Sequence, residues 1–174
     1  MKLIKKYPFG PYIFQFERYH DHRGYFNEII RNNKIQIIDK VINFKQDNLS
    51  KSKKNVFRGF HYQMKPKAQA KLIFVLNGKI DDYFFHLNKK SKYYKKVFKI
   101  TLDSKDNKCI YLPDDCAHGF HSLEKDTIVY YKCTNLYSKK NERSISLYDI
   151  TLKLETSLLK KNLIISKKDL LINE

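Results

Sequence analysis

The chain has 174 residues, which is long enough for one domain with a hydrophobic core and short for two. Hydrophobic residues make up 42% and aromatic residues 14%, a content that excludes an intrinsically disordered chain, and no apolar run is long enough to span a membrane. The formal net charge of +17 suggests an anionic partner: nucleic acid, an anionic membrane or a phosphorylated substrate.

Short β-strands separated by turn residues run through most of the chain. In chain order they are predicted at 12–17, 40–48, 71–77, 79–87, 97–102, 108–112, 118–123, 127–134 and 144–149. The dipeptide Asn77-Gly78 is a strong signal for a two-residue hairpin between two of these strands. Strands with this spacing are typical of an antiparallel sandwich or barrel, so we expect one all-β domain over residues 1–174.

Two segments favour helix. One short helix is predicted within residues 28–39, and a helical pattern is also found in the tail, residues 156–174. In that tail Ser166 resembles an N-cap and Asp169 an acidic residue in the first turn. We therefore expect a short C-terminal helical segment attached to the β domain.

The basic residues are spread over the whole chain. Thirty of the 35 are lysines, which favours a solvated basic surface over a binding stripe. The densest basic and aromatic cluster, residues 88–96, could grip single-stranded nucleic acid by stacking and charge, but we favour a hairpin connection with solvated lysines there. We expect no specific nucleic-acid partner and no membrane partner.

The three cysteines do not indicate a disulfide framework or a cysteine zinc site. Cys109, Cys116 and Cys133 are odd in number and show no paired close spacing, so we expect free thiols. The first six residues lack the apolar core of a signal peptide. A cytoplasmic protein is the expectation.

The most informative stretch runs from residue 58 to residue 71. Arg58, His61 and Lys71 lie within what reads as one hairpin. The arginine offers a fork that fits a phosphate, the histidine a base that titrates near neutral pH, and the lysine a cation that can stabilise an oxyanion. The alternative interpretation is three ordinary polar positions on a solvated sheet face.

A second polar turn, Pro113-Asp114-Asp115-Cys116-Ala117-His118-Gly119, lies between two strands, as a comparable element does in small cupin-type barrels. A metal-binding cupin needs His-x-His and a later Glu, whereas here Gln63 stands two residues after His61 and no Glu follows at a suitable distance. His20 and His22 stand two apart without a third ligand in view. We expect no metal. A base, an orienting carboxylate, a lysine and a tyrosine are sufficient to move a proton next to a carbonyl without one.

Several segments together resemble the dTDP-4-dehydrorhamnose 3,5-epimerase family. They occur in its order and spacing, and the match covers about residues 7 to 171: Arg23-Gly24-Tyr25-Phe26, Gln46-Asp47-Asn48-Leu49-Ser50, Arg58-Gly59-Phe60-His61-Tyr62-Gln63, Lys71-Leu72, Pro113 to Phe120, Tyr131-Lys132 and Ser166-Lys167-Lys168-Asp169. The resemblance implies a cupin-type double-stranded β-helix (jelly roll), a homodimer, no cofactor, and a nucleotide-linked 4-keto-sugar as substrate.

The resemblance also implies residue roles. His61 is the expected base at C3 and C5 of the sugar, Asp169 fixes its tautomer, and Lys71 stabilises the enolate at O4. Tyr131 is the expected acid on the opposite face. The expected substrate-binding residues are Arg23, Arg58, Gln46 and Asn48 at the diphosphate, Phe26 and Tyr137 beside the base, Glu28 in the nucleotide site, and His118, with Asp82, near the lysine.

The chain departs from the family pattern away from the proposed proton-transfer residues. Residues 144–149 replace a tryptophan-containing stretch, residues 86–88 replace Asp-x-Arg, and residue 136 is Leu where an aromatic is frequent. These departures leave alternatives open: inversion at C3 only, epimerisation or ketoisomerisation of another nucleotide sugar, or a non-catalytic cupin that binds a sugar or nucleic acid. A non-catalytic module would not need His61 and Asp169 together.

Overall fold

The computed structural model describes residues 1–30, 34–37, 40–152, 154 and 156–170. The elements, in chain order, are β1 (Lys2–Lys6), β2 (Tyr12–Gln15), β3 (Tyr19–Asp21), β4 (Gly24–Phe26), β5 (Lys34–Ile37), β6 (Lys40–Asn43), β7 (Gln46–Ser52), β8 (Val56–Gln63), β9 (Lys71–Asn77), β10 (Lys79–His86), β11 (Phe98–Asp103), β12 (Lys108–Leu112), β13 (Cys116–Ser122), β14 (Thr127–Cys133), β15 (Glu142–Ser144), α1 (Thr156–Leu159), β16 (Ile164–Ile165) and α2 (Lys167–Leu170).

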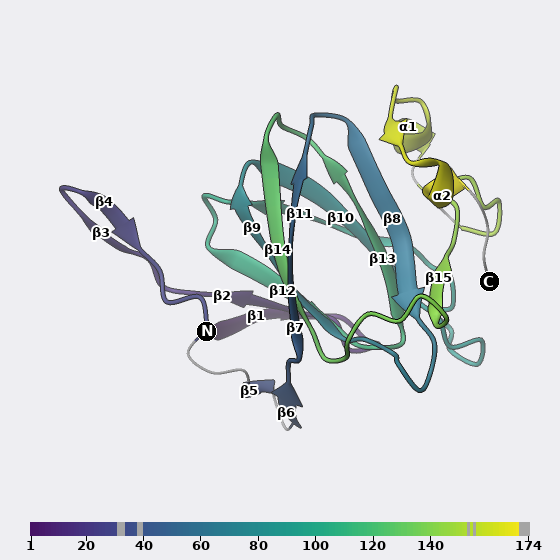
Figure 1. Ribbon diagram of the computed structural model, residues 1–174, viewed down its shortest axis with the longest axis horizontal. Helices are drawn as coiled ribbons and strands as arrows, with labels where there is room; N and C mark the ends of the chain where they lie inside the picture. Colours follow the sequence, from purple (N-terminus) through teal and green to yellow (C-terminus); the bar gives the residue numbers. More distant parts are fainter. Residues whose placement is uncertain (31–33, 38–39, 153, 155, 171–174) are drawn as a thin grey trace.

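Two antiparallel sheets face each other (Figure 1). One has the strand order β1-β2-β12-β9-β14-β7 and the other β11-β10-β13-β8-β15, with β16 joining β8 in parallel. The short helices lie beside β8, outside the second sheet (Figure 1). The expected all-β jelly roll with a short C-terminal helical segment is confirmed.

Hydrophobic side chains fill three layers. Between the sheets, a cluster that includes Ile73, Phe84 and Ile110 is almost fully buried. A second cluster, around Phe74, covers the outer face of the sheet that contains β9. A third cluster, around Phe60, lies between the other sheet and the C-terminal segment. Strand β9 is buried from residue 71 to residue 75, as expected for a central strand covered on both faces.

The hairpin predicted at Asn77-Gly78 is wrong. The strands on either side, β9 and β10, belong to different sheets, so the dipeptide forms a corner where the chain crosses the sandwich. Gly78 has a φ of +77°, and a Cβ there would lie 2.6 Å from Oγ1 of Thr127. The same backbone requirement that favours Asn-Gly in hairpins therefore operates at a sheet-to-sheet corner.

Three other predicted elements need correction. Within 28–39 the described residues 34–37 form strand β5, which pairs with β6 and contributes the buried Ile37, while 31–33 and 38–39 lie outside the described residues. The predicted strand 40–48 is two strands, β6 and β7, and β7 continues to Ser52. The predicted strand 144–149 is represented only by β15, which ends at Ser144.

The C-terminal helical turn begins as expected. Ser166 accepts a hydrogen bond from the backbone N–H of Asp169 through Oγ (3.2 Å), which makes it the N-cap of α2. In the part of the chain that the structure describes, neither helix is long and apolar enough to cross a membrane.

Candidate active site

A cavity of about 800 Å³ lies between the two sheets and is bordered by α2. Nine of the twelve predicted site residues line it: His61, Asp169, Lys71, Tyr131, Gln46, Asn48, Arg58, His118 and Tyr137. They come from β7, β8, β9, β13, β14, α2 and the loop after β14, so the fold gathers segments that are far apart in the sequence.

A bulge in β8 allows both Arg58 and His61 to face the cavity. Residues three apart on a regular strand point to opposite faces. Here His61 pairs with His118 and Arg58 pairs with Phe120, so β8 has one residue more than β13 between these two positions. At the bulge Gly59 has a φ of +148°, and a Cβ on it would overlap the Cα of Gly119.

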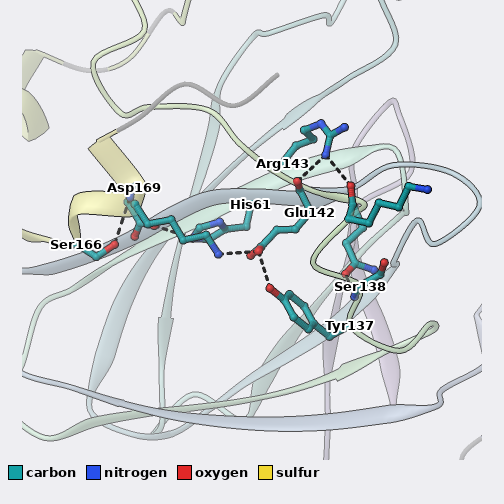
Figure 2. A network of polar contacts seen from close by, with 10 residues as sticks. His61, Tyr137, Ser138, Glu142, Arg143, Ser166 and Asp169 are labelled. Atoms are coloured by element: carbon teal, nitrogen blue, oxygen red, sulfur yellow. Dashed lines mark hydrogen bonds and ion pairs between the residues drawn. The ribbon is translucent and has the colours of Figure 1, made fainter.

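The side chain of His61 is hydrogen-bonded to Asp169. Nε2 of the ring lies 3.1 Å from Oδ1 of the carboxylate, and Figure 2 shows Asp169 on one side of His61. The backbone N–H of Gly59 donates to the other carboxylate oxygen (3.3 Å). Burial opposes ionisation of Asp169, but its hydrogen bonds with His61, Gly59 and Ser166 keep its pKa below the ordinary value.

The pairing with Asp169 fixes which nitrogen of His61 can act as a base. The carboxylate accepts a hydrogen bond from the Nε2–H group, and the lone pair of the neutral ring is then on Nδ1. Nδ1 is buried and has no hydrogen-bond partner among the described residues. No other group of the described chain competes for this nitrogen, and the His61 side chain is part of the cavity lining.

Lys71 lies opposite His61, not beside it in a hairpin. The expected hairpin is wrong because β8 and β9 belong to facing sheets, and Nζ of Lys71 donates to the backbone oxygen of His61 across the interior (3.4 Å). Lys71 is buried, which lowers its pKa, while nearby Cys133, Asp82 and Glu142 offset part of this effect. A desolvated ammonium of this kind interacts strongly with a developing oxyanion.

His118 and Asp82 form a buried pair behind Lys71. Nδ1 of His118 lies 3.4 Å from Oδ2 of Asp82, whose side chain is fully buried. Burial, together with Lys71 and His61, holds the pKa of His118 well below its usual value. Burial also raises the pKa of Asp82 well above its usual value, against the attraction of Lys71. Both shifts favour the neutral forms of the pair, which lies close enough to Lys71 to interact with it electrostatically.

Tyr131 lines the cavity from β14, in the sheet that faces His61. Burial raises the pKa of its phenol, with a further contribution from Cys133 and an opposing one from Arg58. Tyr131 thus keeps its proton at neutral pH and can donate it.

Charged side chains line the solvent-exposed part of the cavity. Arg58 donates from Nε to Oγ of Ser52 (3.0 Å) and from a terminal nitrogen to the backbone oxygen of Lys51 (3.2 Å), which leaves further N–H groups of its guanidinium for a ligand. Nζ of Lys168 lies 2.6 Å from Oε2 of Glu142, and the same oxygen accepts from the Tyr137 hydroxyl (2.8 Å; Figure 2). These groups give the open end of the cavity two cations and one paired carboxylate.

Three predicted residues lie outside the cavity. Arg23 lies in the turn between β3 and β4, Phe26 ends β4, and Glu28 lies in the segment after it; none of them lines the cavity of its own chain. The β3–β4 hairpin projects away from the sandwich (Figure 1), and Phe26 is 66% exposed. Arg23 forms an exposed ion pair with Asp21.

Several residues that line the cavity are not among the site residues predicted from the sequence. They are Ser50, Gln69, Cys133, Glu142 and Lys168. Ser50 and Cys133 could have been found by strand alternation, because each lies two residues from a predicted site residue.

Gln63 is buried and has a structural role: its side-chain amide forms hydrogen bonds with the backbone of Lys67, Leu136 and Ser138. In the described parts of the chain, no three His, Cys, Asp or Glu side chains converge as around a metal ion.

Comparison with known proteins identifies the family. The sequence model of dTDP-4-dehydrorhamnose 3,5-epimerase matches residues 9–174. The dTDP-4-dehydrorhamnose 3,5-epimerase of Methanothermobacter thermautotrophicus is 36% identical over 169 residues, which are 97% of this chain and 91% of that protein. The crystal structure of the enzyme from Elizabethkingia anophelis superposes with a TM-score of 0.88 at 33% identity, covering 99% of this chain and 95% of that one.

A structure with a ligand is also similar. The dTDP-6-deoxy-D-glucose-3,5-epimerase of Legionella pneumophila, in complex with dTDP-4-keto-L-rhamnose, has a TM-score of 0.84 at 29% identity, over 97% of this chain and 89% of that one. The resemblance found in the sequence motifs therefore holds over nearly the whole chain. The chain belongs to the dTDP-4-dehydrorhamnose 3,5-epimerase family and is a nucleotide-sugar epimerase.

Proposed function

We propose that the chain inverts C3 and C5 of a dTDP-linked 4-keto-6-deoxyhexose, in its simplest form dTDP-4-keto-6-deoxyglucose, on a route to an L-rhamnose-like sugar donor. The observation that carries this assignment is the His61–Asp169 pair, which faces Lys71 and Tyr131 from the opposite sheet. The dTDP-4-keto-L-rhamnose bound to the Legionella relative supports both the nucleotide and the sugar.

The first step is removal of the proton at C3. His61 accepts that proton, and the electron pair of the broken C–H bond forms the C3–C4 double bond of an enolate. Negative charge moves to O4, where the ammonium of Lys71 stabilises it. Asp169 keeps the proton on Nε2 and stabilises the imidazolium that forms.

The second step is protonation from the opposite face. Tyr131 donates its phenolic proton to C3, the double bond of the enolate returns to the ketone at O4, and the configuration at C3 is inverted. Exchange with solvent then restores the proton of Tyr131 and removes that of His61. Repetition at C5, the other carbon next to the ketone, completes the reaction. Carbon and oxygen keep their oxidation states overall, so the scheme requires no redox partner.

The open end of the cavity suits the nucleotide diphosphate. Arg58 and Lys168 supply cations there, and the amides of Gln46 and Asn48 supply N–H groups. Tyr137 is 54% exposed and held by Glu142, a position from which its ring can stack on a base. His118, paired with Asp82, orients Lys71 at the sugar end.

A second copy of the chain supplies the remaining contacts. Arg23, Phe26 and Glu28 match nucleotide-binding positions of the family yet lie outside the cavity of their own chain. The projecting β3–β4 hairpin could reach the cavity of a partner in a two-fold symmetric dimer (Figure 1). A homodimer in which each chain completes the other's site therefore accounts for both the sequence motif and the geometry. The free thiols of Cys109, Cys116 and Cys133 fit a cytoplasmic location.

The test is proton NMR of dTDP-4-keto-6-deoxyglucose with the purified protein in D2O. We expect the proton signals at C3 and C5 to disappear as deuterium replaces these protons. We also expect the signals of dTDP-4-keto-L-rhamnose to appear. Exchange at C3 alone would restrict the activity to a 3-epimerase. Exchange at neither carbon, with an active relative as positive control, would exclude this substrate.

A further inference from the structure

A line of hydrogen bonds runs along the cavity wall from the loop after β14 to the strand position opposite Lys71. The backbone N–H of Tyr137 donates to Oε1 of Gln46 (2.6 Å), and Nε2 of Gln46 donates to Oδ1 of Asn48 (2.8 Å). Nδ2 of Asn48 lies 3.6 Å from Sγ of Cys133, within the range of an N–H···S hydrogen bond. Gln46 and Asn48 are two apart on β7, so both face the cavity.

The direction of every bond in this line is set at one end. A backbone N–H can only donate, so the Tyr137 amide requires an oxygen from Gln46. The NH2 group of Gln46 then requires the oxygen of Asn48, and the NH2 group of Asn48 requires an acceptor at its far side. Turning either amide over would bring two donors together. Cys133 is the acceptor at which the line ends.

This polarity determines what the two amides present to a ligand. Each carboxamide oxygen already accepts a bond from the protein, while each NH2 group uses one of its two hydrogens. The remaining hydrogens are donors, and they lie in a cavity that also holds Arg58 and Lys168. These free N–H groups, together with the two cations, match an anionic diphosphate.

Cys133 is placed to fix this arrangement. It is 1% exposed, lines the cavity, and is the strand partner of Lys71 between β14 and β9. Cys133 is also the strand partner of Gln46 between β14 and β7, so the sulfur lies beside both amides of the line. Burial raises the pKa of the thiol, so sulfur carries no charge and acts as a neutral acceptor.

We propose that Cys133 is a positioning residue for nucleotide-sugar binding: its sulfur holds Asn48, and through Asn48 it holds Gln46, with their free N–H groups directed at the diphosphate. The inference rests on the proposed use of this cavity for the nucleotide sugar. Cys133 takes part in no proton-transfer step, and the proposal gives this buried residue a role in substrate affinity.

The experiment measures binding of dTDP by isothermal titration calorimetry to the full chain and to Cys133→Ala and Cys133→Ser. The two variants remove the same sulfur atom, and only serine restores an acceptor. We expect Kd to rise about three- to tenfold in Cys133→Ala, the range for one lost hydrogen bond, and to stay near the unaltered value in Cys133→Ser. Cys109→Ala, which removes an equally buried thiol away from the cavity, should bind as the unaltered chain does.

Kinetics separate positioning from general damage to the fold. Cys133→Ala should raise KM for the nucleotide sugar with kcat changed by less than about twofold, because the proton-transfer groups are untouched. Thermal unfolding establishes that each variant is folded; if Cys133→Ala is not, Cys133→Val fills the space without an acceptor and should show the same weaker binding. Equal affinities of the alanine and serine variants would overturn the inference while the proposed function stands. Absence of dTDP binding by the unaltered chain would overturn both.

Discussion

Nε2 of His61 and Oδ1 of Asp169 lie 3.1 Å apart and join β8 to the C-terminal helical turn. Two further hydrogen bonds position Asp169: Ser166 caps α2, and the backbone N–H of Gly59 donates to the second carboxylate oxygen. Helix α2 is thus attached to the sandwich through the same carboxylate that orients the proposed base. A change at Asp169 should therefore affect both stability and chemistry.

Asp169→Asn tests the stabilising part of this pair through its pH dependence. The pKa of Asp169 is lower in the folded chain than its ordinary value of 3.8, so ionisation favours folding. This contribution is complete above 3.8 and is lost as the pH falls through the lower, folded value. We expect the variant to be about 1–2 kcal/mol less stable at neutral pH and the difference to shrink in acid.

Chemical denaturation of the two proteins across this pH range provides the measurement. Asp106→Asn, at a carboxylate in an exposed loop, serves as a control for the loss of one negative charge. A stability difference that does not change between neutral and acid pH would show that the pair stabilises through packing and not through charge.

Lys71→Met separates charge from shape at the oxyanion position. Methionine keeps an unbranched chain of similar length and removes the ammonium. Because the ammonium is buried, its loss should leave the free energy of unfolding unchanged or higher. The rate should fall about 10²- to 10³-fold, the scale for removal of one stabilising group. Steady-state kinetics measure this rate, with Lys125→Met as a control for the loss of one exposed lysine. A rate of Lys71→Met within a few-fold of that of the unaltered chain would show that Lys71 does not stabilise the enolate.

Tyr131→Phe should uncouple exchange from inversion. His61 can still remove the C3 proton and return a deuteron to the same face, so deuterium should enter at C3 without a change of configuration. Formation of the epimer should fall by about 10²- to 10⁴-fold, the range for loss of a general acid. NMR in D2O reports both quantities in one sample. Equal losses of exchange and inversion would mean that Tyr131 is not the acid of the second step.

Mixed dimers test whether the β3–β4 hairpin acts on the partner chain. Arg23→Ala and His61→Ala should each lose activity when pure. A mixed dimer contains one cavity with an intact His61 that receives an intact Arg23 from its partner. Co-expression in equal amounts should therefore restore about a quarter of the unaltered activity. Sedimentation equilibrium verifies the assembly; failure of the mixed dimer to regain activity, with each variant dimeric, would place Arg23 in its own chain's site or outside any site.

Strand positions and the residues of the cavity could be predicted to a large extent from the sequence. Alternation along β7 and β14 places Gln46, Asn48 and Tyr131 on one face of each strand. Alternation alone would separate Arg58 from His61, and only the bulge opposite Gly119 brings both into the cavity. A bulge depends on pairing with a distant strand, so no local pattern reveals it.

The pairing of strands was less predictable than their positions. Asn77-Gly78 satisfies the backbone geometry of a hairpin and of a corner between sheets equally well, and the choice between them depends on which strands cover the core. The same limit applies to Arg23 and Phe26, whose motif indicates nucleotide binding although they project away from their own cavity. In this chain the sequence motifs indicate the chemistry of a residue more reliably than its position relative to the cavity of the same chain.

The central claim is that His61, held by Asp169, removes the proton at C3. Its most direct test is the rate of solvent deuterium uptake at C3 of dTDP-4-keto-6-deoxyglucose, measured for the unaltered chain and for His61→Asn, with dTDP titration verifying that the variant still binds nucleotide. We predict that the unaltered chain exchanges this proton and that the variant does so about 10²- to 10⁴-fold more slowly, or not at all. Exchange by the folded, dTDP-binding variant at a rate near that of the unaltered chain would contradict the claim.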